Sequence, residues 1–367
     1  MLEVSAGMSY RQGVKLLNQL LHRNTGSALK FRTYRDFCER TGKQIEKSII
    51  QKTDQTLEKY GFNAESGKVT EKIASELTRN AKYSEEKEII QKAIEEINAT
   101  RTDEDEKIQN IAWQTEKTEN TCYVSLDEIG VKHQKEHRKT ETEKDGVYVW
   151  NTVADVEFNG ESRILTGSEM KSVFLFVLAY LLNNNLLAEK SLVFFTDGAR
   201  NIFSNITELF SFHPHTVILD WFHLKKHCQE YLSMSVKGKE KRNEILQKLL
   251  RILWAGNVDE AIDFLQKTEK TVVRQNNRID ELCRYIEKHR EHIPPYALRA
   301  KLGLKNSSNR VEKANDIIVA QRQKHNGMSW SVTGSSGLAQ ISALITNGEL
   351  KSWIDSSISG DYFSLVA

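Results

Sequence analysis

Residues 190–200 read KSLVFFTDGAR, and with TCYVSLDEIGV at 121–131 and HTVILDWFHL at 215–224 they decide the fold of this chain. In each stretch a short run of β-prone apolar residues leads into an aspartate, which is Asp127, Asp197 or Asp220. Runs of this length bounded by polar residues are typical of buried strands. We therefore expect three strands that each deliver a carboxylate to an edge of one sheet.

The segments between these strands complete an α/β pattern. Two further strands are predicted at 146–158 (GVYVWNTVADVEF) and 161–167 (ESRILTG), with a charged hairpin tip before them at 132–146. Apolar helices follow at 168–185 and 201–210. The order of three strands, helix, strand, helix, strand is that of a ribonuclease-H-like mixed sheet, whereas a flavodoxin-like fold would alternate strictly.

An all-helical stretch separates this core from a late amphipathic helix. Residues 224–303 have helical periodicity throughout and end near Pro294-Pro295. The sequence SSNRVEKANDIIVAQRQKH at 307–325 then predicts one more helix, opened by capping candidates at 307–309. Glu312 and Asp316 lie one turn apart on it, and spacing alone does not choose between them.

The N-terminal residues resemble a helix-turn-helix. One helix is predicted at 8–23, a turn-prone segment at 24–27, and a second, basic helix at 31–45. A plain helical hairpin with a solvated basic face is the alternative interpretation. The second helix carries the candidate DNA-binding residues Arg32, Arg35, Arg40 and Lys43.

Composition limits the class of protein without identifying a partner. The 367 residues contain 52 Lys and Arg against 50 Asp and Glu, so the formal net charge of +2 does not itself indicate nucleic-acid binding. Four widely spaced cysteines predict free buried thiols in a reducing compartment. There is no run of 18 apolar residues and no signal pattern, so we expect no membrane partner and a cytoplasmic location.

The acids suggest metal chemistry. Two carboxylates on adjacent parallel strands can share a divalent ion, and Mg²⁺ prefers such oxygen ligands. Two ions about 3.5–4 Å apart activate the attacking oxygen and stabilise the leaving oxygen in phosphoryl transfer. Gly198 after Asp197 would allow a DNA backbone to approach closely. A simple strand-end turn is the alternative at each aspartate.

Asp220 and His223 form a polar pair after the third of these strands, followed by Lys225 and Lys226. They could lie near a phosphate, or Asp220 could be only the cap of the next helix. Asp220, His223, His227 and Cys228 could also form a zinc site, although nothing in the spacing requires all four to converge.

Four stretches taken together resemble the bacterial insertion-sequence transposases of the Mutator-like DDE superfamily. They are YVSLDEIGV, VFFTDGARNIF, VILDWFHLKKH and SSNRVEKANDIIVAQRQKHNGMSW, within residues 120–335. In that family two strand-borne aspartates and a helix-borne glutamate are separated by a helical insertion. The resemblance selects Asp127, Asp197 and Glu312, and it matches Asp220 and His223 to an accessory pair and Asn309 to the Asn-x-x-Glu motif.

The resemblance implies a DNA transposase that uses two Mg²⁺ or Mn²⁺ ions. Such an enzyme cuts at the terminal inverted repeats of an insertion element and joins the resulting 3′-hydroxyl to target DNA, as a dimer or higher oligomer. In a bacterial cell it would be nucleoid-associated when bound to DNA. Further DNA contacts are expected from Arg310, Arg322 and Lys324 on the late helix.

The predicted organisation follows from these elements. We expect a helix-turn-helix region at 1–50, a charged helical linker at 51–118, the first part of the catalytic core at 119–223, an all-helical insertion at 224–305, and the last part of the core at 306–367.

Two other functions compete with the transposase. A phosphatase of the haloacid-dehalogenase type would need a second aspartate two residues after Asp127, where Ile129 stands. An inactive or domesticated transposase would bind DNA through the N-terminal helices alone. The sequence does not decide between cut-and-paste and copy-out transposition.

Overall fold

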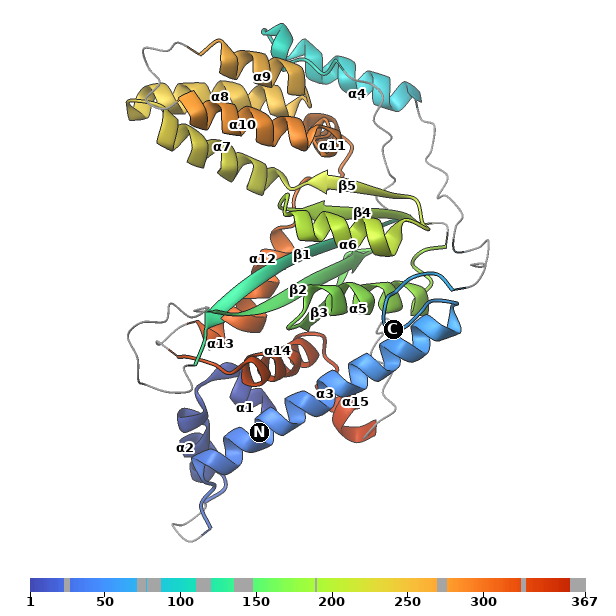
Figure 1. The fold of residues 1–367 in the computed structure, drawn as a ribbon, viewed down its shortest axis with the longest axis vertical. Coiled ribbons are helices and arrows are strands. Elements are labelled where there is room, and N and C mark those ends of the chain that lie inside the picture. Colours follow the sequence, from blue (N-terminus) through green and yellow to red (C-terminus); the bar gives the residue numbers. More distant parts are fainter. Residues whose placement is uncertain are drawn as a thin grey trace.

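A mixed sheet lies at the centre of the chain in a computed structural model (Figure 1). The structure describes residues 1–22, 27–70, 77, 87–109, 120–134, 148–188, 190–268, 276–324 and 328–356. In these residues the sheet has five strands in the order β3-β2-β1-β4-β5. The strands are β1 Thr121–Lys132, β2 Tyr148–Phe158, β3 Glu161–Gly167, β4 Ser191–Thr196 and β5 His215–Leu219. β1, β2 and β3 pair antiparallel, whereas β4 and β5 run parallel to β1. The predicted mixed α/β sheet is confirmed.

Two helices provide the crossovers that parallel pairing requires. α5 (Met170–Asn183) joins β3 to β4, and α6 (Arg200–Phe210) joins β4 to β5. α5 is apolar on almost every side because it lies between the sheet and α3 (Phe31–Lys59). The predicted hairpin tip between β1 and β2 falls largely outside the described residues.

The register of β1 corrects one detail of the prediction. Asp127 was expected where its strand ends, but β1 continues to Lys132. Ile129 and Val131 are buried on alternate positions, so the two-residue alternation that defines a half-buried strand continues past the acid. Asp127 therefore lies within a strand, and its backbone is paired with Val153 of β2.

In the described residues between β5 and the late helix, the secondary-structure elements are helices. The α-helices are α7 Trp221–Ser235, α8 Lys239–Trp254, α9 Val258–Gln266, α10 Asn276–Lys288 and α11 Tyr296–Lys301. They enclose an apolar core that also includes Tyr123, Val193 and Phe195 from one face of the sheet. The first and last residues of the insertion lie side by side, since Trp221 N donates a hydrogen bond to Asn306 O at 3.0 Å.

After the insertion the chain returns as a helical rod. α12 (Asn309–Asn315) continues through a π-helical turn (Asp316–Ala320) into α13 (Gln321–Gln323). α12 packs on β1 and β2. α14 (Val332–Thr346) and α15 (Leu350–Ser356) follow at the lower end of the molecule in Figure 1.

The N-terminal helices are built into this lower end. α1 (Leu2–Gly7) and α2 (Tyr10–Leu20) precede α3, which packs along α14 and α5. α3 continues to Lys59 because buried small or apolar residues recur every three or four positions along it, from Tyr34 through Cys38 and Ile45 to Leu57. It is much longer than the predicted second helix and serves as a strut under the core (Figure 1).

The described part of the predicted linker packs on the insertion. α4 (Lys87–Ala99) and the turn after it place Ala93, Ile94 and Ile108 against Ala297 and Leu298. An ion pair between Glu106 and Arg251 at 2.7 Å fastens the same segment to α8.

Candidate active site

Three aspartates lie in one row across the sheet. β1 and β4 pair up to Ser125 and Phe195, so Asp127 and Asp197 each follow by two residues on neighbouring strands. β4 and β5 pair up to Thr196 and Leu219, which places Asp220 next to Asp197 in the same row. Neighbouring strands are about 4.8 Å apart, and residues two apart along a strand share a face. The register therefore places these three acids side by side on one face of the sheet, where β4 and β5 end and β1 continues.

Asp220 links the start of the insertion to the start of α12 through buried hydrogen bonds. It is 1% exposed, and its Oδ1 caps α7 by accepting from Phe222 N at 2.7 Å and His223 N at 3.1 Å. Its Oδ2 accepts from the backbone N and, at 2.8 Å, from the Oγ of Ser308, which directly precedes α12. One buried carboxylate thus fixes where the insertion begins and where α12 begins.

His223 connects Asp220 to Glu312. Its Nδ1 lies 3.4 Å from Asp220 Oδ1, and its Nε2 lies 3.5 Å from Glu312 Oε1. The side chain of Glu312 is 39% exposed, so it reaches the site from the solvent edge of α12. Burial alone would lower the pKa of His223. The nearby carboxylates of Asp220, Asp197 and Glu312 have the larger, opposite effect, so the pKa is raised.

Asn315 belongs to the site although the sequence did not single it out. Its Nδ2 donates to Asp127 Oδ2 at 2.6 Å, and its buried Oδ1 has no hydrogen-bond partner. Asn315 lies one turn after Glu312, so both can reach the sheet from one side of α12. The rival acid Asp316 is exposed and instead accepts from Gln321 Nε2 at 2.9 Å. The only sequence signal for Asn315 was its three-residue spacing from Glu312.

The insertion forms a wall beside Asp197. Tyr285 Oη on α10 donates to Asp197 O at 3.4 Å. Gly198 has a φ of +95°, and a Cβ there would lie 3.1 Å from His289 Nε2 and 3.2 Å from Tyr285 Oη. Burial lowers the pKa of His289 to about 4, with help from Lys288, so its ring is neutral near pH 7. This turn therefore requires glycine both for its backbone angle and for the approach of α10.

The carboxylates differ in their electrostatic surroundings. Burial raises the pKa of Asp127, and repulsion from Asp197 adds to this, against hydrogen bonds from Glu128 N and Asn315. Burial acts in the same direction at Asp220, but hydrogen bonds from His223 and Ser308 lower its pKa overall. The surroundings of Asp220 thus favour its ionised form. Those of Asp127 disfavour it, so a nearby positive charge would stabilise the Asp127 carboxylate.

The three carboxylates are suitable ligands for a hard cation, but they are too far apart in this structure to bind one ion together. Asp127, Asp197 and Glu312 offer carboxylate oxygens, the ligands that Mg²⁺ and Mn²⁺ prefer. Within the described residues, no three or more His, Cys, Asp or Glu side chains are close enough together to hold a metal ion. Glu312 contacts His223 and Asp127 contacts Asn315, so side-chain rotation would have to bring the acids together. Cys228 of the zinc alternative is fully buried in the core of the insertion.

The other predicted residues lie around this centre or far from it. Asn309 is exposed and lines a pocket of about 320 Å³ with Asp155 and Glu157, where Arg310 Nη1 pairs with Glu157 Oε2 at 3.0 Å. Arg32, Arg40 and Lys43 are exposed on α3, and Arg35 pairs with Asp36 at 2.7 Å. Lys324 is exposed, but Arg322 is buried.

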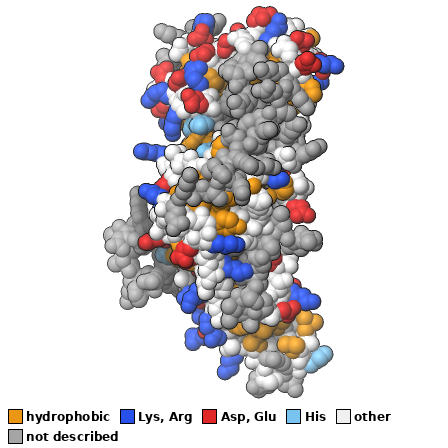
Figure 2. Space-filling view, turned by 90° about the vertical axis from the view of Figure 1, so that its right-hand side faces the viewer, with side chains coloured by type: hydrophobic (Ala, Val, Ile, Leu, Met, Phe, Trp, Pro, Cys, Tyr) orange, Lys and Arg blue, Asp and Glu red, His pale blue; other side chains and the backbone are white. Residues whose placement is uncertain are grey.

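The surface carries both signs of charge. On the face shown in Figure 2, acidic and basic side chains mix at the upper end, where α4 and the insertion lie, while several basic side chains lie in the lower half. Of the helices in the described residues, none has the length and apolar composition that a membrane span needs. All four cysteines are buried and unpaired, as expected.

Comparison with known proteins assigns a family. The profile of the Uncharacterised protein family (UPF0236) matches residues 43–355, and the chain belongs to this family. No curated protein matches it. A solved structure, "Drosophila P element transposase strand transfer complex", is similar at 10% identity over 72% of this chain and 70% of that chain, with a TM-score of 0.22. A score this low does not show a shared fold.

Proposed function

We propose that this member of the UPF0236 family is a metal-dependent DNA transposase of the DDE type, with Asp127, Asp197 and Glu312 as its catalytic carboxylates. One observation carries the proposal. Two neighbouring parallel strands and the helix that returns after the helical insertion bring their acids to one face of the sheet around His223. The mixed five-stranded sheet and the place of the insertion support the proposal of a ribonuclease-H-like core. Four sequence motifs that resemble those of Mutator-like DDE transposases support it as well.

The proposed reaction is phosphoryl transfer in two steps. Water attacks a phosphodiester at the end of the element, and the P–O3′ bond breaks to release a 3′-hydroxyl. That hydroxyl then attacks a target phosphodiester, so one P–O bond forms for each that breaks. Two Mg²⁺ or Mn²⁺ ions held by the three carboxylates would activate the attacking oxygen and stabilise the leaving oxygen.

The residues around the acids have positioning roles in this proposal. Asp127 is held by the sheet and by Asn315, while Asp220 and Ser308 fix the start of α12 and with it Glu312. The pKa of His223 is raised by its carboxylate neighbours, and in its protonated form the ring would place a positive charge beside the phosphate that is to be cut. Such preorganised charge stabilises a transition state without reorganisation during the reaction.

DNA is the proposed partner. The exposed basic residues Arg32, Arg40, Lys43 and Lys324 would contact phosphates, which position the nucleic acid without reading its sequence. Two element ends must be processed together, so the active form would be a dimer or higher oligomer.

The test is metal-dependent cleavage of labelled DNA that carries the inverted repeats flanking the reading frame. Wild type should cut with Mg²⁺ or Mn²⁺ and not with EDTA. Asp127→Asn, Asp197→Asn and Glu312→Gln should each lower the rate about 10²–10³-fold or more, because a lost metal ligand removes several kcal/mol of transition-state stabilisation.

A matched control lies on the same helix as Glu312. Asp316→Asn changes an exposed carboxylate that accepts a hydrogen bond from Gln321, and cleavage should stay near the wild-type rate. Equal cleavage by wild type and the three active-site variants would refute the assignment. DNA binding without cleavage by a folded wild type would instead favour the inactive, domesticated DNA-binding protein.

A further inference from the structure

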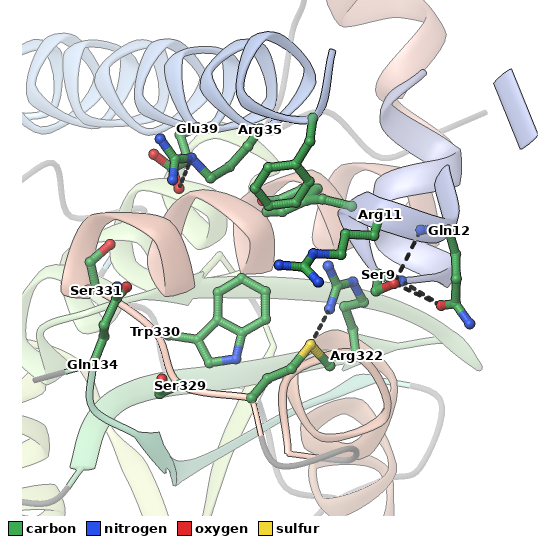
Figure 3. A pocket seen from close by; sticks show the side chains of 13 residues that line it. Ser9, Arg11, Gln12, Arg35, Glu39, Gln134, Arg322, Ser329, Trp330 and Ser331 are labelled. Atoms are coloured by element: carbon green, nitrogen blue, oxygen red, sulfur yellow. Dashed lines mark hydrogen bonds and ion pairs between the residues drawn. The ribbon is translucent and has the colours of Figure 1, made fainter. Parts of the chain in front are cut away.

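A second pocket lies at the lower end of the molecule, away from the carboxylates. It has a volume of about 690 Å³ (Figure 3). It is formed by the starts of α2 and α3, by Gln134 two residues after β1, by α13 and by the segment before α14. Basic, aromatic and hydroxyl side chains share its wall, among them Ser9, Arg11, Arg35, Arg322, Trp330 and Ser331. This mixture of side chains distinguishes it from an apolar packing defect.

Arg322 is the unusual member of this wall. It is 3% exposed, and its guanidinium carbon lies 5.2 Å from the centre of the Tyr10 ring and 5.0 Å from that of Trp330. Its Nε donates to Ser5 O at 2.9 Å and its Nη1 to Met328 Sδ at 3.2 Å. Within the described part of the chain no carboxylate lies within ion-pair distance of it. Buried charges are normally paired, so this cation lacks an anionic partner among the residues that the structure describes.

The surroundings of Arg322 add further affinity for an anion. Figure 3 shows Arg11 and Arg322 reaching into the space beside the Trp330 ring, and Arg11 also lies 5.6 Å from the centre of the Phe31 ring. Ser9 and Ser331 cap α2 and α14, so two helix N-termini open at this wall. Glu39 is the acid in the wall, and Arg35 Nε lies 3.7 Å from it. Arg35 also pairs with Asp36 at 2.7 Å, so three arginines against two carboxylates leave a positive excess of one charge.

We propose that this pocket binds a phosphate-bearing, unpaired nucleotide of a DNA strand, which extends the proposed transposase function. A volume of about 690 Å³ falls in the range of small-ligand sites and is too small for a double helix. Arg322 and Arg11 would pair with the phosphate, because guanidinium groups match phosphate oxygens in bidentate geometry. Phe31 and the exposed edges of Tyr10 and Trp330 would contact the base, as aromatic side chains do in single-strand binding sites.

The rod that carries Glu312 also relates this pocket to the carboxylates. Glu312 and Arg322 are ten residues apart along α12, the π-helical turn and α13. At about 1.5 Å per residue they are separated by about 15 Å, the length of four or five nucleotide steps in a stacked strand. A strand cut at the carboxylates would therefore reach the pocket with a nucleotide a few positions away from the cut.

The experiment measures binding in EDTA, so its result does not depend on catalysis. Fluorescence anisotropy compares a labelled single strand with a duplex of the same sequence, with a deoxynucleoside monophosphate and inorganic phosphate as competitors. We expect the single strand to bind more tightly than the duplex and both small competitors to be weak. Arg11→Gln and Arg322→Gln should each weaken single-strand binding about tenfold or more.

Control variants distinguish binding in this pocket from non-specific attraction of DNA to basic residues on the surface. Lys15→Gln removes an exposed charge one turn along α2 that does not line the pocket, and its single-strand affinity should match that of wild type. Arg11 is exposed, so Arg11→Gln keeps the test valid if the buried Arg322→Gln fails to fold. A strand containing 5-iododeoxyuridine should photocrosslink to Phe31, Tyr10 or Trp330.

Three results would overturn the proposal. They are unchanged affinity in the folded Arg11→Gln protein, tighter binding of the duplex than of the single strand, and full competition by inorganic phosphate or the monophosphate alone. The last would assign the pocket to a free anion. Failure of DNA cleavage with intact, arginine-dependent strand binding would count against the catalytic proposal and leave the pocket proposal supported.

Discussion

At the scale of single residues, Asp220 links parts of the chain that are far apart in sequence. Its two oxygens accept from Phe222 and His223 on one side and from Ser308 on the other. Asp220→Asn would turn an amide N–H toward one of these donors and leave buried hydrogen bonds unmade. We expect a loss of about 1.5–3 kcal/mol of unfolding free energy, because the lost bonds are buried and charge-assisted. Urea denaturation measures the change, and Asp316→Asn, which alters an exposed acid, should cost less than about 0.5 kcal/mol.

The positions of the acids relative to the strands were easier to predict from the sequence than the residues that contact them. Asp127, Asp197 and Asp220 follow runs of buried apolar residues, which is a local signal. The bond from Asn315 to Asp127 depends on how α12 crosses the sheet, and no local pattern encodes a crossing. The burial of Arg322 between Tyr10 and Trp330 is equally non-local, since those rings come from opposite ends of the chain.

At the scale of elements, the turn from β4 into α6 determines how closely the insertion approaches Asp197. Gly198→Ala would place a methyl group against His289 and Tyr285 and strain a φ of +95°. We expect the turn to shift, moving Asp197 and lowering the rate of metal-dependent cleavage about tenfold or more, since small misplacements of catalytic groups are costly. Gly238→Ala is the control, because its φ of +82° is equally strained but no atom lies within 4 Å of the new Cβ. Equal rates for the two variants would show that α10 does not position Asp197.

The order of the elements was more predictable than their extent. Strands and helices from β1 to the insertion appear in the predicted order because each depends on its own periodicity. The lengths of β1 and α3 were underestimated, since both continue where neighbouring elements cover them. The stretch around α4 was predicted to be part of a charged helical linker, yet a narrow stripe of isoleucines is enough to pack it on the insertion.

At the scale of the whole molecule, α3 and α14 bind the N-terminal helices to the sheet. The two helices touch at Gly42 and Gly337, where a Cβ added to Gly42 would lie 2.4 Å from Gly337 Cα. The three nearest atoms to this Cβ are all backbone atoms of Gly337, so the clash cannot be relieved by a side-chain rotation. The pocket and the carboxylates are therefore expected to keep a fixed distance, because α3, α14 and the core form one packed unit.

Gly42→Ala tests this unit. Glycine to alanine within an exposed helix normally stabilises by about 0.5–1 kcal/mol, whereas here overpacking should destabilise by about 1–3 kcal/mol and lower the melting temperature. Gly7→Ala is the matched control, because Gly7 is helical and no atom lies within 4 Å of its new Cβ. If α3 instead moved as a separate DNA-binding arm, α3 and α14 could separate slightly at little cost, and the two variants would melt alike. A lower melting temperature in Gly42→Ala together with weaker single-strand binding would show that the contact between α3 and α14 also shapes the arginine-lined pocket.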